Sequence, residues 1–154
     1  MRMIVVALAL AAALASGPAQ AMALALEAPA SASARLGAVR VALWLRNASD
    51  RPLRASLDPG QLHVALRDAS GAVLPCDPPA PPRGKLTEIA PGQRASLLLD
   101  IGTRCRLEAP GAYAVEVAYA GPGGRAGPTS TALRVTRWVN PGPRPTARPG
   151  ARSR

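Results

Sequence analysis

The chain has 154 residues, 19 basic and 9 acidic side chains, and a formal net charge of +10. This length suits one domain with a modest core, so an array of several large domains is excluded. Two cysteines and one histidine are too few for a closed zinc site built from four such ligands.

The first 21 residues have the three zones of a secretory signal peptide. Arg2 supplies the charged start, residues 4–15 are apolar, and Ala19-Gln20-Ala21 is the small-x-small pattern that a signal peptidase accepts. The apolar run is shorter than the roughly 20 residues that a membrane-spanning helix needs. We therefore expect a signal peptide helix at 1–21, cleavage after Ala21, and an exported protein, periplasmic or extracellular, without a transmembrane anchor in its mature chain.

Apolar and polar residues alternate through most of the remaining sequence, which predicts half-buried strands rather than helices. The clearest case is residues 39–46, where four aliphatic residues occupy every second position. Such a row must be buried, because it would otherwise lie in water. The same pattern predicts further strands at residues 22–27, 53–57, 62–67, 72–74, 95–101, 113–119 and 133–139.

Turn-forming residues separate these strands. They lie at residues 47–50, 58–60, 68–71, 91–92 and 121–127. The first group predicts a hairpin between the strands at 39–46 and 53–57, and the last predicts a glycine-rich connection. Residues 77–84 contain four prolines, so we expect an extended surface loop of polyproline type there.

Seven to eight short strands joined by turns predict an all-β fold, an antiparallel β-sandwich, with an antiparallel barrel as the alternative. The expected domains are a signal peptide at 1–21, the sandwich at 22–139 and a tail at 140–154. The tail has no aliphatic side chain larger than alanine, so we expect it to be disordered.

Cys76 and Cys105 are the only cysteines, and both lie in the part that export would deliver to an oxidising compartment. An even cysteine count in such a compartment predicts one disulfide. Closing a loop of this length is worth about 3 to 4 kcal/mol in the chain-entropy model. A metal site or a nucleophilic thiol is the disfavoured alternative.

Two segments resemble bacterial immunoglobulin-like domains. Residues 41–53 are similar to a strand, polar turn and returning strand, and residues 111–115 are similar to the corner of an immunoglobulin-like sandwich. The resemblance implies that Tyr113 is a structural corner residue whose hydroxyl bonds to nearby backbone. The Asp68–Gly71 and Pro91–Gly92 turns are also similar to those of the BsuPI-type proteinase-inhibitor family, which would imply an inhibitory loop.

No group of residues predicts catalysis, and we expect neither an enzyme nor a cofactor. His63 lies opposite an aliphatic row, which favours an exposed strand position over a catalytic base. Asp68 and Ser70 are better explained as turn formers than as partners of that histidine. Asn47-Ala48-Ser49 matches the glycan-acceptor triplet, but turn capping is favoured.

Candidate partner contacts are two tryptophans and the arginines of the tail. Trp44 and Trp138 lie opposite aliphatic rows, where a tryptophan can stack on a sugar, anchor a partner protein or cover a sheet edge. The tail arginines are Arg144, Arg148, Arg152 and Arg154. They favour screened attraction to acidic surfaces, although an arginine-rich composition of the whole chain also explains the charge. Without interleaved aromatic residues, specific nucleic-acid recognition is not expected.

The expected function is therefore an exported, non-enzymatic binding or structural module of the bacterial envelope. Its expected partner is an unknown protein or an acidic envelope polymer. The alternative is a secreted proteinase inhibitor that presents the proline-rich loop at residues 77–84.

Overall fold

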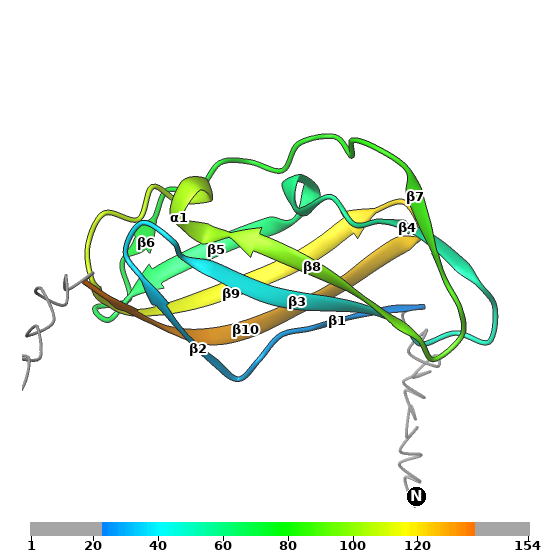
Figure 1. Ribbon diagram of the computed structural model, residues 1–154, viewed down its shortest axis with the longest axis horizontal. Helices are drawn as coiled ribbons and strands as arrows, with labels where there is room; N and C mark the ends of the chain where they lie inside the picture. Colours follow the sequence, from blue (N-terminus) through cyan, green and yellow to red (C-terminus); the bar gives the residue numbers. More distant parts are fainter. Residues whose placement is uncertain (1–22, 138–154) are drawn as a thin grey trace, which may run out of the picture.

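A computed structural model describes residues 23–137, and these residues form an all-β sandwich (Figure 1). The predicted signal peptide at 1–21, the tail at 140–154 and Trp138 lie outside the described residues. No helix within the described part is long and apolar enough to cross a membrane.

Three sheets make up the described part of the fold. The first has the order β1 (Leu24–Glu27), β3 (Arg40–Asn47) and β8 (Arg94–Asp100). The second has the order β2 (Ser31–Arg35), β10 (Gly124–Thr136), β9 (Gly111–Gly121), β5 (His63–Asp68) and β6 (Val73–Leu74). A small third sheet pairs β4 (Leu53–Ser56) with β7 (Leu86–Ile89) at one end of the sandwich (Figure 1).

The core lies between the three-stranded and five-stranded sheets, and alternation along the strands fills it. From the first sheet it receives the aliphatic row of β3 together with Leu97 and Leu99 of β8. From the second sheet it receives Val115 and Val117 of β9 and Leu133 of β10. Each of these side chains is buried, while the residues between them face outward, as two packed sheets require. The predicted all-β sandwich is confirmed.

The predicted hairpin between residues 39–46 and 53–57 is wrong. β3 pairs on one side with β1 and on the other with β8, so both of its edges are already occupied. β4 pairs instead with β7. Turn-forming residues determine only that the chain changes direction locally. Which strand then pairs with β4 depends on which strands still have an unpaired edge.

β2 was not predicted, because its small side chains alternate without a hydrophobic signal. Its pairing with β10 is parallel, so the expectation of purely antiparallel sheets is wrong for this pair. All other strand pairs in the described residues are antiparallel.

The glycine-rich segment 121–127 is not a free connection, because most of it belongs to the β9–β10 hairpin. Gly123 occupies the tight turn with a φ of +91°, and a Cβ there would lie 2.7 Å from the carbonyl oxygen of Arg54. Only glycine satisfies both the backbone conformation and this close approach.

Candidate functional site

The structure confirms the disulfide between Cys76 and Cys105. Cys76 lies two residues after β6, and Cys105 directly follows a short helix, α1 (Ile101–Arg104). The strand predicted at 95–101 therefore ends one residue earlier, at Asp100, because Ile101 begins this helix. The two sulfur atoms are bonded to each other, so neither cysteine is a free nucleophile or a metal ligand. In residues 23–137 no cluster of three histidine, cysteine or acidic side chains could hold a metal ion.

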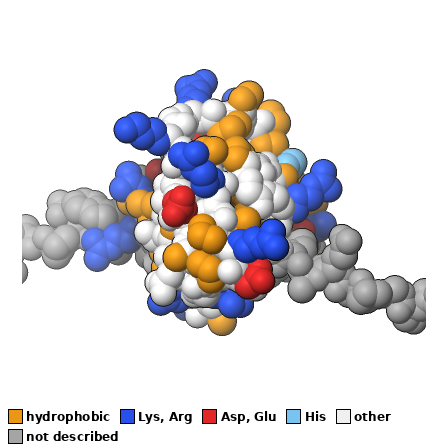
Figure 2. Space-filling model, turned by 90° about the vertical axis from the view of Figure 1, so that its right-hand side faces the viewer, with side chains coloured by type: hydrophobic (Ala, Val, Ile, Leu, Met, Phe, Trp, Pro, Cys, Tyr) orange, Lys and Arg blue, Asp and Glu red, His pale blue; other side chains and the backbone are white. Residues whose placement is uncertain are grey.

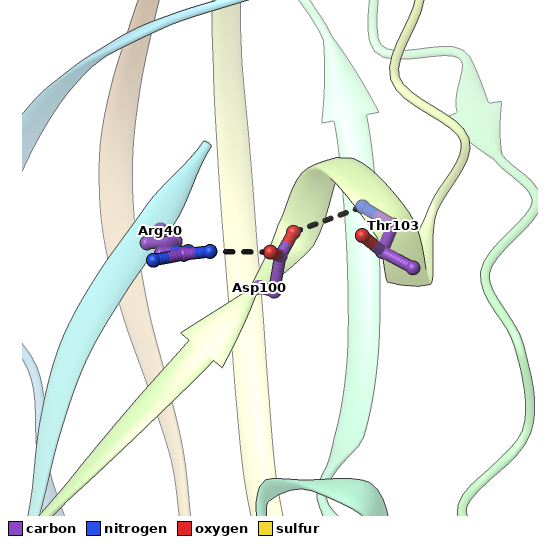
Figure 3. A network of polar contacts seen from close by, with 3 residues as sticks. All are labelled: Arg40, Asp100 and Thr103. Atoms are coloured by element: carbon purple, nitrogen blue, oxygen red, sulfur yellow. Dashed lines mark hydrogen bonds and ion pairs between the residues drawn. The ribbon is translucent and has the colours of Figure 1, made fainter. Parts of the chain in front are cut away.

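Asp100 ends β8 and begins α1 (Figure 3). Its Oδ1 accepts a hydrogen bond from the backbone N–H of Thr103 at 3.0 Å, and its Oδ2 accepts one from Nε of Arg40 at 3.3 Å. The bond from the Thr103 N–H is the main cause that lowers the pKa of this carboxyl group. An aspartate at this position therefore stops the strand by capping the helix.

Arg104 bonds three backbone carbonyl groups, two in the segment 59–62 and one at the start of the proline-rich loop. Its Nη2 donates to the oxygen of Leu62 at 2.7 Å, Nη1 to the oxygen of Pro59 at 3.2 Å, and Nε to the oxygen of Asp77 at 3.0 Å. This residue was not predicted, because nothing in a sequence marks a side chain that bonds carbonyl groups far away. The result is that the region around the disulfide has a second, polar connection.

The proline-rich segment 77–84 is an exposed loop without strand structure, as predicted. It runs along one edge of the sandwich between β6 and β7 (Figure 1). The N–H of Ala80 donates to the carbonyl oxygen of Gly60 at 2.9 Å, and the N–H of Arg83 donates to Oδ2 of Asp58 at 2.9 Å. Together with the disulfide, these bonds fix the loop against the short 3₁₀ helix η1 (Pro59–Gln61).

The hydrogen bonds of Asp58 predict how the stability of the fold depends on pH. The N–H groups of Gly60 and Arg83 bond its carboxylate and lower its pKa below the ordinary value of 3.8. The stabilisation that the ionised Asp58 contributes is present above pH 3.8, and it is lost as the pH falls through the lower pKa that Asp58 has in the folded chain. Asp58→Asn should therefore show a shallower loss of unfolding free energy between about pH 4 and 2, measured by urea denaturation.

Asp50→Asn is the matched control for this experiment, since Asp50 is an exposed turn aspartate that makes none of these bonds. The control should keep the pH dependence of the natural chain. An equal change in both variants would contradict a special contribution of Asp58.

Tyr113 lies near the start of β9, and its hydroxyl donates to the carbonyl oxygen of Ala109 at 2.8 Å. This is the hydrogen bond that the immunoglobulin-like resemblance implied. A second tyrosine bond was not predicted: Tyr119 is buried, accepts from the N–H of Ser56 at 3.2 Å and donates to the oxygen of Pro122 at 2.8 Å. Burial raises the pKa of Tyr119. Tyr113 therefore connects β9 to the segment before it, and Tyr119 connects β9 to the end of β4 and to the turn before β10.

Trp44 lies half-buried on the outer face of the three-stranded sheet. The guanidinium of Arg94 lies 5.3 Å from the centre of its ring, and Glu27 bonds Nε of Arg46 at 2.6 Å and approaches Arg94 at 3.9 Å. One face of the indole ring is thus covered by a cation from the same molecule. Less of the surface of the Trp44 ring is therefore open to a partner than its position opposite an aliphatic row indicated.

Asn47 and His63 differ sharply in their surroundings. Asn47 has 0% exposure, and its side-chain amide bonds Arg51, Ile89 and Ser49. A side chain used in this way is a turn cap and cannot present its nitrogen to a glycan-transferring enzyme. His63 is exposed at the start of β5, as its position in the alternation indicated.

The outer face of the five-stranded sheet carries exposed Arg35, Arg67 and Arg134. Within residues 23–137, none of the three has a carboxylate within the 4.0 Å of an ion pair. The alternation of β5 and β10 indicated that Arg67 and Arg134 face outward, but their neighbourhood depends on non-local pairing. Figure 2 shows that basic side chains also outnumber acidic ones around one end of the sandwich.

Comparison with models of known protein families gives no match, and comparison with curated proteins gives none either. A solved structure with some similarity is the Pseudomonas fluorescens alkylpurine DNA glycosylase AlkC bound to DNA containing an abasic site analog. The identity is 16%, the TM-score is 0.37, and the match covers 75% of this chain and 31% of that chain. The present chain thus spans about a third of that protein, and the likeness is too slight to carry an argument.

Proposed function

We propose that this protein is an exported, non-enzymatic module of the bacterial envelope that binds an anionic partner, either a protein or an acidic envelope polymer. The observation that carries the proposal is the set of exposed arginines on the five-stranded sheet, Arg35, Arg67 and Arg134, which have no acidic ion-pair partner among the described residues. A positive face of this kind attracts anionic partners and speeds their encounter with the protein.

The non-enzymatic part of the proposal is supported by the position of the groups that a catalytic triad would need. His63 begins β5 and Asp68 ends it, and Oδ1 of Asp68 bonds the hydroxyl of Ser70 at 2.6 Å. A working triad needs its histidine in hydrogen-bond contact with both other groups. Asp68 and Ser70 instead shape the turn that leads to β6.

An immunoglobulin-like module is supported by the strand order and by Tyr113. β9, the penultimate strand, lies between β10 and β5, and its early tyrosine bonds to backbone upstream. Immunoglobulin-type sandwiches have the same arrangement at the corresponding strand and corner. Folds of this class carry many functions, so the argument for binding rests on the surface rather than on the fold.

Export is supported by the disulfide, because such bonds persist mainly in oxidising compartments. When the full chain is produced in a bacterium with its N-terminus intact, the exported protein should begin at Met22, measured by mass spectrometry. The mature chain, immobilised and exposed to an envelope extract, should then retain an anionic partner that elutes as salt rises. Uncleaved chain found only in the cytoplasm would contradict export, and retention that is insensitive to salt would contradict an anionic partner.

A second candidate, proteinase inhibition, is favoured by the fixed conformation of the loop at 77–84. A loop already held in an exposed, extended conformation loses little entropy when a proteinase binds it. If the protein is an inhibitor, an excess of the mature chain should block a serine proteinase, and replacing residues 78–82 with glycine and serine should abolish the block. Full proteinase activity with a large excess of chain would reject this candidate.

A further inference from the structure

We propose that the outer face of the five-stranded sheet binds a linear acidic polysaccharide, which lies diagonally across the strands from Arg67 through Arg134 to Arg35. This inference rests on the proposed binding function and names the class of its partner. We call the surface formed by these three residues and the small side chains between them the arginine face.

The strand register places the three arginines on one diagonal. Arg67 of β5 pairs with Ala114 of β9, which pairs with Ala132 of β10. Arg134 lies two residues farther along β10. Thr136, another two residues along, pairs with Arg35 of the edge strand β2. Paired residues share a sheet face, so all three guanidinium groups extend from the same side.

Small side chains form the surface between the arginines, so this surface lies close to the backbone of the sheet. Ala112, Ala114 and Ala132 are exposed on β9 and β10, and Ser31 and Ser33 are exposed on β2. Three shallow hollows adjoin here, since they share residues of β2, β9 and β10; the shared residues are Ser33, Ala112, Arg134 and Thr136. An extended polymer can therefore approach the backbone of the sheet closely while its charges pair with the arginines along its path.

The arginines on the outer face of the three-stranded sheet differ, because they form ion pairs with acidic side chains of the same molecule. On the three-stranded sheet, Arg40 bonds Asp100 at 3.3 Å, and Glu27 contacts both Arg46 and Arg94. An exposed acidic side chain, Glu116, lies two residues along β9 from Ala114, on the side away from Arg134 and Arg35, and within residues 23–137 it forms no ion pair. The net positive charge of this face remains available to an external anion.

A polysaccharide fits this surface better than other polyanions do. The hydroxyl groups of Ser31, Ser33 and Thr136 can bond sugar hydroxyls between the charged positions. Single-stranded nucleic acid binds where aromatic rings stack on bases. Tyr113 contributes to the lining of one hollow, but its side chain packs against the core and its hydroxyl bonds Ala109. Anionic membranes are held most firmly where apolar side chains also enter the lipid, whereas alanine, serine and threonine form this surface.

The test measures binding of the mature chain to sodium polygalacturonate, a linear uronic-acid polymer, by titration calorimetry at low and moderate salt. The triple variant R35Q/R67Q/R134Q should bind about tenfold more weakly, because it loses three exposed ion pairs. The matched control is R40Q/R46Q/R94Q, which removes the same charge from the opposite face and should change the affinity less than twofold. Thermal unfolding of both variants checks that each is folded at the temperature of the assay.

Each other outcome overturns the inference in a distinct way. Equal losses in both triple variants would show that net charge, not the arginine face, attracts the polymer. Equal or tighter binding of anionic vesicles or an oligothymidine would overturn the polysaccharide class. If polygalacturonate does not bind but an envelope extract still supplies a salt-sensitive partner, this inference fails while the proposed function stands; if the extract supplies none, the proposed function fails as well.

Discussion

Replacing Cys76 by serine is expected to lower the melting temperature by about 10 °C or more. The disulfide joins positions 29 residues apart, and without it the unfolded chain gains the entropy of an open loop, worth about 3 to 4 kcal/mol. The folded state also loses its covalent connection between the segment after β6 and the end of α1. Differential scanning calorimetry at neutral pH measures the effect.

The double variant, in which Cys105 is also serine, is the control for the free thiol that a single substitution leaves behind. It should melt near the single variant, because in both cases the same cross-link is lost. The natural chain treated with a reductant should approach the same temperature. Unchanged melting in all three samples would contradict a stabilising disulfide.

Asn47→Ala is expected to destabilise the fold by about 3 kcal/mol, because it leaves several buried polar groups without partners. The side-chain Nδ2 donates to the carbonyl oxygens of Arg51 at 2.7 Å and Ile89 at 2.8 Å. Its Oδ1 accepts from the N–H of Ser49 at 2.9 Å. One side chain thus connects the end of β3, the turn that follows it and the end of β7. Urea denaturation of the variant measures the loss.

Ser49→Ala is the matched control, because it removes only a hydroxyl, which bonds Oδ1 of Asn47 at 2.7 Å and the backbone O and N–H of Arg51 at 3.0 and 3.4 Å. It should cost less than about 1 kcal/mol, since the Ser49 N–H and the Nδ2 contacts remain. The same substitution destroys the glycan-acceptor triplet without removing the asparagine. Equal destabilisation by both substitutions would contradict a dominant role of the buried amide.

Alternation allowed most strands and their buried faces to be predicted. The aliphatic row from Val39 to Leu45 could belong only to a strand with one face in the core, and the structure buries all of that row. β2 escaped prediction because Ser31 and Ser33 look the same as loop residues until β10 pairs with them. Its place depends on a neighbour about a hundred positions away, which local sequence patterns do not reveal.

The candidate surface was predicted less completely than the fold. The positions of Arg67 and Arg134 in their strands indicated that both face outward, but their alignment with Arg35 exists only through the register of four strands. Trp44 was a candidate contact residue, yet it lies half-buried and Arg94 lies over its ring. Arg104 bonds only backbone oxygens, so no pair of side chains in the sequence marked it.

The loop at 77–84 has only four backbone N–H groups, since its other four residues are proline. Three of these groups donate hydrogen bonds: Asp77 to the oxygen of Arg104, Ala80 to the oxygen of Gly60, and Arg83 to Asp58. Amide hydrogens in such bonds exchange with solvent only when the bonds open. The loop should therefore show slow hydrogen exchange, as a strand does, although it belongs to no sheet. Its rigidity comes from contacts with α1 and η1, so opening of that neighbourhood, rather than of the loop alone, sets the rate at which these hydrogens are lost.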